Sequence, residues 1–167
     1  ARRYGVPLRS SNTTAAPVVD AQATWESLAS IRACIDAHAH VMMQGGGWLE
    51  GGLTCSFEKL ILDAELLQLQ AALLEPLALD AQTLGLDAIA EAGHGGHFFA
   101  TAHTMERYEE AFHRSLLAEG SPFETWAEDG APDTRALAEA RVAKLLAEHE
   151  APALDEGVRE SLEDYAA

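Results

Sequence analysis

Apolar residues recur at spacings of three and four positions between Asp20 and about Asp36. Four of them form the repeating set: Trp25, Leu28, Ile31 and Ile35. This spacing is typical of an amphipathic helix, and Asp20 is suited to accept hydrogen bonds from its first turn. The pattern therefore predicts a helix over this stretch.

A second helix is expected from Phe57 to about Glu75, with Ser56 as its N-cap and Pro76 as its stop. Its apolar residues fall on more than one side, which predicts that the helix is well buried. Further helices are expected at about Ala81–Ala92, at Met105–Leu117 after a Thr104 cap, from Asp133 to about His149, and after Asp155.

The signals for strands are weaker. A short strand is expected around Ala37–Met43, and residues 1–18 are expected to be irregular because they hold two prolines and a polar run. Five of the nine residues of Gln44–Gly52 are glycine, which predicts a shaped loop. The chain is therefore expected to be mostly helical, and its 167 residues are too few for a complete eight-stranded α/β barrel of about 250 residues.

Charge and cysteine content narrow the classes of partner. The formal net charge is −16, and a surface of that sign repels nucleic acid and anionic membranes. No apolar run approaches the ~20 residues needed to cross a bilayer. Cys34 and Cys55 form no metal or disulfide pattern, which suits a reducing cytoplasm.

Two histidines suggest one candidate metal site. His38 and His40 are two positions apart, so on a strand both imidazoles would point to one face, as in a metal-dependent hydrolase of amidohydrolase type. That class needs seven more strands, whereas the remaining sequence indicates helices. Two polar histidines at the end of a strand explain the pattern more simply, and the hydrolase is kept as an alternative.

Other motifs are weighed in the same way. His94 and His97 could chelate a metal, but loop histidines more often position a substrate. Ser56 and Lys59 match a Ser-x-x-Lys pair, which helix capping explains fully. Trp48 and Glu50 would suit a methylated ammonium ion through cation–π and charge attraction, although packing of Trp48 in the loop and a solvated Glu50 explain the residues slightly better.

Taken together, several segments resemble the C-terminal part of the trimethylamine methyltransferase family in order and spacing. The most specific are Gly47-Trp48-Leu49-Glu50-Gly51-Gly52-Leu53 and Gly95-Gly96-His97-Phe98. Supporting segments include Arg2–Pro7, Asp20–Ala23, Ser56–Lys59, Leu62–Glu65, Ala88–Glu91 and Phe123–Trp126. His94 stands where a proline is expected in relatives, which bears on the choice of substrate.

The resemblance implies an α/β fold, namely the C-terminal part of a (β/α)8 TIM barrel that is mostly helical in this fragment. Residues 1–167 would form one segment of a single methyltransferase domain, with C-terminal helices from about 123. It further implies a cytoplasmic enzyme of one-carbon metabolism that moves a methyl group from a methylated amine to the cobalt of a corrinoid. The corrinoid would be carried by a cognate partner protein, and no bound metal is expected in this chain.

Family members that act on trimethylamine carry pyrrolysine, whereas many relatives lack it and demethylate compounds such as glycine betaine. Because the chain holds only standard residues, the branch without pyrrolysine is preferred. A non-catalytic fragment, or one that self-associates to cover an exposed barrel face, stays open as an alternative.

Active sites of barrels lie in the loops that follow the strands, which selects two groups of residues. The catalytic candidates are His40, Gln44, Glu50, His97 and His103. The substrate-binding candidates are Met43, Trp48 and Phe98. Together they are expected to form one pocket from the two glycine-rich loops.

Overall fold

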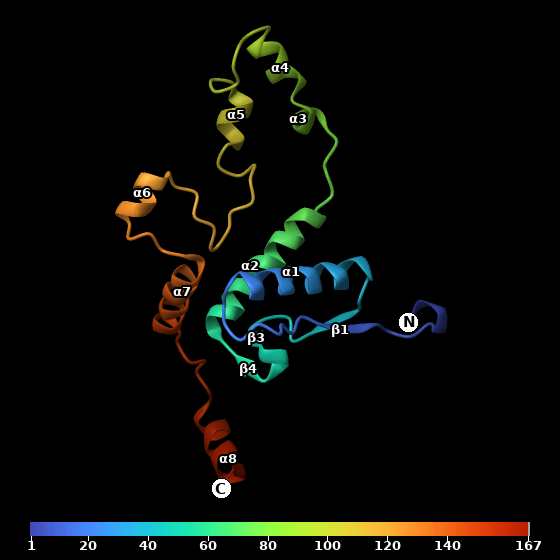
Figure 1. Cartoon of the computed structure of the whole chain (residues 1–167), viewed down its shortest axis with the longest axis vertical. Helices are drawn as coiled ribbons and strands as arrows, with labels where there is room; N and C mark the ends of the chain where they lie inside the picture. Colours follow the sequence, from blue (N-terminus) through green and yellow to red (C-terminus); the bar gives the residue numbers. More distant parts are fainter. Residues whose placement is uncertain (167) are drawn as a thin grey trace.

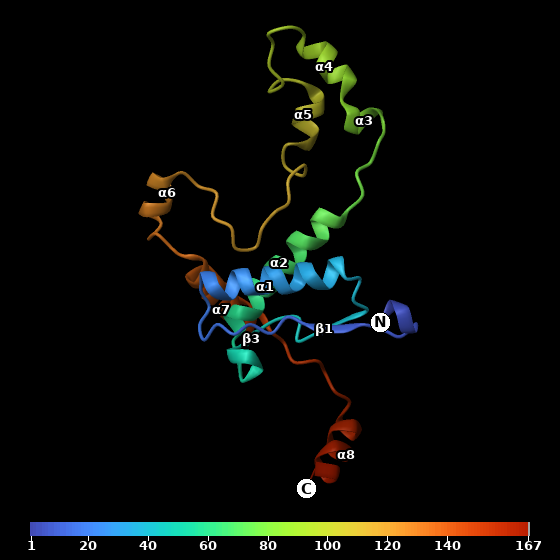
Figure 2. The same cartoon turned by 45° about the vertical axis from the view of Figure 1, so that its right-hand side comes forward.

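A computed structural model describes residues 1–166 of the chain. Two long helices and two small sheets form a central body, and a third helix, α7 (Thr134–Glu148), packs on it (Figure 1). An arm projects from one side of this body and consists of α3 (Ala81–Leu84), α4 (Leu86–Ala92) and α5 (Ala102–Arg107), and α8 (Glu156–Ala166) extends from the other side (Figures 1 and 2). Mostly helical structure with small sheets agrees with an α/β fragment.

The central body begins with a β-α-β unit. Strand β1 (Arg9–Ser11) leads through α1 (Ala21–Asp36) to β2 (Val41–Met43), and the two strands pair in parallel, Arg9 opposite Val41. A short 3-10 helix, η1 (Arg2–Tyr4), precedes them. The expectation that residues 1–18 are irregular is therefore wrong at β1, because a strand of three residues is too short to show an alternating pattern.

Helix α1 begins where the sequence predicts. Asp20 Oδ1 accepts the Ala23 N–H at 3.1 Å, which satisfies one of the free amides of the first turn. The buried face differs from the expected one: it holds Ala23, Ser27, Ile31 and Cys34, whereas Trp25 is 60% exposed. Small and polar residues make up most of the face that packs on the body. A prediction based on the large apolar residues alone therefore assigns the wrong face of the helix to the core.

The glycine-rich loop folds into a small hairpin. Strand β3 (Trp48–Leu49) turns through the 3-10 helix η2 (Glu50–Gly52) into β4 (Thr54–Cys55), with Trp48 paired to Cys55. Leu49 is buried against Ala16 and Ala23. Gly47, Gly51 and Gly52 adopt positive φ angles, which explains why glycine recurs in this turn.

Helix α2 (Phe57–Leu74) begins at Ser56, whose hydroxyl accepts the Lys59 N–H at 3.2 Å. It packs against α1 and against α7 (Thr134–Glu148), and Leu62, Leu117 and Ala138 form the core between them. The expectation of a well-buried helix is met on one face only, since Leu60, Leu73 and Leu74 are exposed. The buried face carries the polar residues Lys59, Asp63 and Gln70 beside Leu62 and Leu66.

The arm departs from the sequence prediction in two places. The expected helix at 81–92 is divided into α3 (Ala81–Leu84) and α4 (Leu86–Ala92) by Gly85, which has a φ of 60°. The expected helix Met105–Leu117 is instead α5 (Ala102–Arg107), capped by Thr101. It stops early because the segment after it bonds to α2: the Ser115 hydroxyl and the Leu116 N–H donate to Glu65, and Leu117 is buried.

The last helices follow turns that contain proline. Helix α6 (Phe123–Glu128) comes after Pro122, and α8 (Glu156–Ala166) begins where Asp155 accepts the Gly157 and Val158 N–H groups. Asp133 caps α7 through the Ala136 N–H at 2.8 Å, as its position predicts. Across residues 1–166, none of the helices combines the length and apolarity that crossing a bilayer requires.

Candidate functional site

Three oxygen-bearing side chains meet at the carboxyl ends of β1 and β2. Ser11 ends β1, Thr13 lies two residues beyond it, and Gln44 directly follows β2. Ser11 Oγ and Thr13 Oγ1 lie 3.0 and 2.9 Å from Gln44 Oε1, and 2.8 Å from each other. Parallel pairing places these ends side by side, which explains how residues more than thirty positions apart come together.

The loop after β2 is fastened to the segment after β1. Asn12 Nδ2 donates to the Gly45 carbonyl at 3.0 Å, and Thr14 Oγ1 donates to the Trp48 carbonyl at 2.9 Å. Further on, the Gly51 N–H donates to the Thr14 carbonyl at 2.8 Å. The two segments therefore hold one another in place at the edge where a parallel sheet carries its functional loops.

Trp48 and Glu50 differ in their surroundings. Leu49 points into the core, so the side chain of Trp48 points to the opposite face of β3, where it is half-buried. Glu50 is exposed, adopts a φ of 51°, and accepts the Thr54 hydroxyl. Met43, at the end of β2, is 42% exposed. Thus Met43 is the last residue of β2, and Gln44, Trp48 and Glu50 lie in the segment that follows it, near the carboxyl ends of the strands.

The segment after Thr14 is held by a carboxylate of α1. Glu26 Oε2 accepts the Ala15 and Ala16 N–H groups at 2.7 and 3.1 Å, and Glu26 Oε1 accepts the Gln22 amide at 2.8 Å. The bond from Gln22 and these two backbone bonds lower the pKa of Glu26 below its ordinary value. Glu26 therefore stabilises the path of the chain that leads away from the cluster.

Behind the hairpin lies a buried ion pair. Lys59 Nζ is 2.6 Å from both carboxylate oxygens of Asp63 and donates to Ser27 Oγ at 2.7 Å. Asp63 Oδ2 also accepts the Gly47 N–H at 2.8 Å. The Ser-x-x-Lys pair thus has two structural roles, because Ser56 caps the helix and Lys59 neutralises a buried carboxylate.

His40 lies away from this cluster, so its expected position after a strand is wrong. It precedes β2, and its Nδ1 accepts the N–H of Leu8, which precedes β1, at 3.0 Å. His40 therefore belongs to the amino ends of the strands. With His38 it lines a groove of about 430 Å³ there, together with residues of the N-terminal segment.

The expected geometry of a two-histidine metal site is also absent from this segment. His38 adopts a φ of 51° and lies in the turn before β2, so the two imidazoles do not share a strand face. Within residues 1–166, no three His, Cys, Asp or Glu side chains are grouped as a metal ion would require. The hydrolase alternative loses the strand geometry on which it depended.

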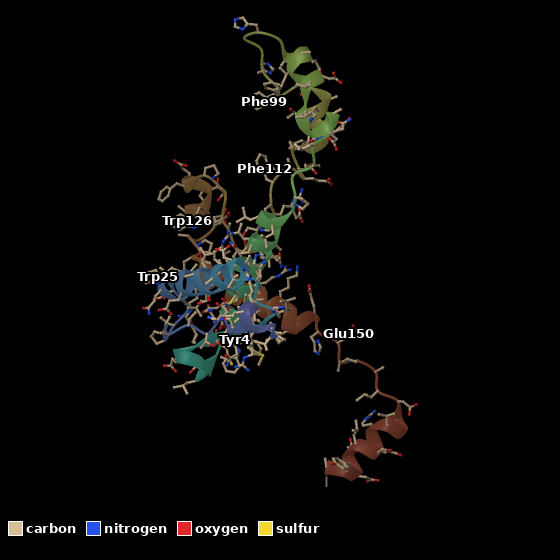
Figure 3. The ribbon with its side chains drawn as sticks, turned by 90° about the vertical axis from the view of Figure 1, so that its right-hand side faces the viewer. Tyr4, Trp25, Phe99, Phe112, Trp126 and Glu150 are labelled. Carbon is tan, nitrogen blue, oxygen red and sulfur yellow. The ribbon has the colours of Figure 1, made fainter. Side chains whose placement is uncertain are left out.

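The second predicted loop lies on the arm. His97 and Phe98 follow α4, next to Phe99, which Figure 3 shows on the arm, well away from Tyr4 and Trp25 of the body. His103 Nε2 is bonded to the Gln82 carbonyl at 2.7 Å, and Arg107 donates to the Gln82 side chain at 2.7 Å. In this structure His103 therefore ties α5 to α3.

The two glycine-rich loops are consequently not halves of one pocket in this structure. The hairpin lies in the central body, whereas α4 and α5 lie on the arm in every view (Figures 1 and 2). Two loops with similar glycine-rich sequences need not lie close together in space, and the residues between these two loops extend away from the body. The prediction that they form one pocket is therefore wrong for this structure.

Comparison with known proteins decides the family. The model of the trimethylamine methyltransferase family matches residues 1–167. The chain belongs to the trimethylamine methyltransferase family. It is 31% identical over 168 residues to the glycine betaine methyltransferase of Desulfitobacterium hafniense (strain Y51), covering 100% of this chain and 35% of that protein. It is 26% identical over 166 residues to the trimethylamine methyltransferase MttB2 of Methanosarcina mazei, covering 98% and 33%.

The chain spans about a third of the length of these two relatives. In this member of the trimethylamine methyltransferase family, the hairpin β3–η2–β4 contains the Gly47–Leu53 motif that carried the resemblance. The second motif, Gly95–Phe98, lies after α4 on the arm. The two most specific motifs therefore occupy separate parts of the structure.

Sequence reasoning missed several residues of the site in this methyltransferase family member. They are Ser11 at the end of β1, Asn12, Thr13 and Thr14 directly after it, and Lys59 and Asp63 on α2. The run of five polar residues at 10–14 was one available signal, because polar residues at the carboxyl end of a strand often line a site. The i, i+4 spacing of Lys59 and Asp63 was another, although it does not reveal that both are buried.

Proposed function

We propose that the full-length protein is a cytoplasmic methyltransferase that moves a methyl group from a methylated amine to the cobalt of a corrinoid. The corrinoid would be carried by a separate cognate protein, and this chain would form the C-terminal portion of the enzyme. The observation that carries the proposal is the family match over all 167 residues.

The preferred donor is a quaternary amine such as glycine betaine, with trimethylamine as the second candidate. The identity of 31% to a glycine betaine methyltransferase, against 26% to a trimethylamine methyltransferase, supports this order. The standard composition of the chain is in keeping with the branch without pyrrolysine. A quaternary amine would leave as a neutral tertiary amine, so this choice requires no proton donor.

We further propose that the chain contributes its strands to a (β/α)8 barrel. A parallel strand pair joined by a helix, as in β1-α1-β2, is the repeating unit of that fold. Barrel enzymes carry their chemistry at the carboxyl ends of the strands. This supports a site built around Gln44 and the hydroxyls of Ser11 and Thr13.

Each group of the proposed site has a task that fits its chemistry. Trp48 would present an aromatic face to the methylated cation, and Glu50 would add attraction of opposite charge. Gln44 would orient the substrate, and the exposed Met43 would line the apolar side. The corrinoid would supply the atom that accepts the methyl group. The residues of this chain would bind the amine, hold the amine in one orientation and exclude water.

The arm residues are left out of this proposed site. His103 is bonded within the arm, and the ring of His97 packs 5.7 Å from that of Phe99. Neither histidine has a described contact with the cluster around Gln44. We propose no catalytic role for His40 either, because it lies at the amino ends of the strands.

The proposal is tested by supplying the full-length enzyme with its cognate corrinoid protein and a panel of amines. Methylation of cobalt is followed by its absorbance spectrum for glycine betaine, trimethylamine, dimethylamine and choline. We expect glycine betaine to give the fastest methylation. Methylation with dimethylamine alone would contradict the quaternary donor, and no methylation with any amine would contradict the reaction.

A further inference from the structure

The hairpin that carries Trp48 is seated on an ion pair with no exposed surface. Lys59 and Asp63 lie one turn apart on α2, and both are 0% exposed. Burying unpaired charge is costly, so such pairs persist where each partner makes further bonds. Lys59 meets this need through Ser27 of α1, and Asp63 meets it through the backbone of the hairpin.

A single backbone amide of the loop, the N–H of Gly47, donates the hydrogen bond to Asp63. The Gly47 N–H donates to Asp63 Oδ2 at 2.8 Å, while the carbonyl of the same residue accepts the Ser56 N–H at 2.9 Å. Gly47 is buried and has a φ of 86°. Both sides of this residue are therefore fixed to the first turns of α2.

The neighbouring residue lies equally close to the helix. A Cβ on Gly46 would lie 2.9 Å from Leu60 Cδ1 and 3.3 Å from the Cβ of Asp63. The backbone of 46–47 therefore rests directly on the buried face of α2. Gln44 and Trp48 lie on either side of this anchored segment, two residues before it and one residue after it.

We propose that Asp63 is a positioning residue for the site at the carboxyl ends of β1 and β2, with Lys59 holding its carboxylate in place. Neither side chain has exposed surface, so neither contacts a substrate. Asp63 acts through Gly47: it fixes the backbone from which Trp48 and Gln44 project. The kinetic part of this inference rests on the proposed methyl transfer, whereas the structural part does not.

Two double variants separate positioning from bulk stability. Lys59→Met with Asp63→Leu removes both charges and leaves no acceptor for the Gly47 N–H. Lys59→Met with Asp63→Asn also removes both charges but retains an acceptor oxygen. Replacing a buried ion pair by apolar residues of similar volume is often neutral for stability. The two variants thus differ in whether position 63 offers an acceptor to the Gly47 N–H, and the asparagine also buries an amide NH2 group.

Hydrogen exchange at residues 44–48 of the full-length protein is the first measurement, and kcat and KM for glycine betaine are the second. We expect Lys59→Met/Asp63→Leu to exchange about tenfold faster in this segment, with kcat lowered by a similar factor and a thermal midpoint near that of the wild type. The asparagine variant should return both quantities to within about threefold of the wild type.

Leu66→Ala serves as the matched control, because Leu66 is buried on α2 without a described bond to the loop. It should lower the thermal midpoint and leave exchange at 44–48 unchanged. Wild-type exchange at 44–48 in the leucine variant would overturn the proposal, as would equally fast exchange in Leu66→Ala. If the leucine variant does not fold, the asparagine variant decides: slow exchange supports positioning, and fast exchange overturns it.

The outcomes also separate this inference from the proposed function. If the wild-type enzyme methylates no corrinoid, the methyl-transfer proposal fails. The exchange measurement still tests whether Asp63 holds the Gly47 backbone in place. If the wild type is active and only the exchange prediction fails, the function stands and Asp63 has no positioning role.

Discussion

Thr13 Oγ1 lies 2.9 Å from Gln44 Oε1, and this hydrogen bond joins the segments that follow β1 and β2. The two residues are 31 positions apart in the chain. Their contact depends on the parallel pairing of two strands of three residues each. The bond also restrains Oε1 of the Gln44 amide, which is the group we assign to orienting the substrate.

Removal of the Gln44 side chain should lower activity. In the full-length enzyme, we expect Gln44→Ala to reduce kcat/KM for glycine betaine about tenfold, or ~1.4 kcal/mol of transition-state stabilisation. Thr13→Val should cost less, about threefold, because the amide stays but loses one of its orienting bonds. Initial rates of cobalt methylation measure both. Ser10→Ala, on β1 outside the cluster, is the control, and an equal loss there would count against the assignment.

The core between α2 and α7 should be sensitive to truncation. Leu62 is 4% exposed and contacts the cluster with Leu117 and Ala138. We expect Leu62→Ala to lower the free energy of unfolding by about 2–4 kcal/mol through lost burial and a residual cavity. Leu74→Ala, on the exposed end of the same helix, should change it by less than ~0.5 kcal/mol. Urea denaturation distinguishes the two, and similar losses would contradict the described packing.

A methyl group at Gly46 should not fit. Its Cβ would lie 2.9 Å from Leu60 Cδ1, closer than real side chains approach, so the loop or Leu60 must shift. We expect Gly46→Ala to destabilise the protein by about 1–3 kcal/mol. Gly120→Ala is the matched control because no atom lies within 4 Å of its added Cβ. Thermal unfolding of the two variants decides, and an unchanged midpoint for Gly46→Ala would refute close contact with α2.

Glu26 should make stability depend on pH. Its pKa is lower in the folded protein than in the unfolded chain, mainly through the bond from Gln22 and then those from the backbone. Its contribution is therefore present above the unfolded pKa of about 4.5 and is lost as pH falls through the lower folded pKa. Glu26→Gln should flatten the decline of stability below about pH 4.5, measured by urea denaturation at several pH values. A decline as steep as in the wild type would contradict this role.

Local features of the fold were readable from the sequence because they depend on neighbours in the chain. Asp20, Ser56 and Asp133 cap their helices as expected, since a cap needs only an oxygen at the right position before a helix. The positive φ angles of the glycine-rich loop follow from the same kind of local reasoning. The family, too, was identified from short motifs in order.

Features that depend on distant contacts were missed. Strand β1 exists because β2 pairs with it. Its three residues are too few to show the alternation of apolar and polar positions from which a strand is predicted. Residues 108–117 looked helical, but the bonds of Ser115 and Leu116 to Glu65 hold this segment against α2. Burial of Lys59 and Asp63 could not be read from a pattern that usually marks a solvated helix face.

The candidate site shows the same contrast between residues that are neighbours in the chain and residues that depend on distant contacts. Gln44, Trp48 and Glu50 lie in one stretch after β2, so a local motif places them together in the chain, and their roles stay a prediction. His97 and His103 were joined to that loop only by assuming that two glycine-rich turns face one another, and the arm separates them (Figure 1). The position of His40 was predicted wrongly because β2 begins one residue after it. His40 therefore lies at the amino ends of the strands and not at their carboxyl ends.

The rate of methyl transfer from glycine betaine in the full-length enzyme carrying Trp48→Ala tests the central claim most directly. Loss of the aromatic face from the carboxyl end of the sheet should reduce the rate at least about tenfold, or ~1.4 kcal/mol. Glu50→Ala, measured alongside, should show a loss in the same direction. A wild-type rate in Trp48→Ala would contradict the placement of the amine site at the hairpin.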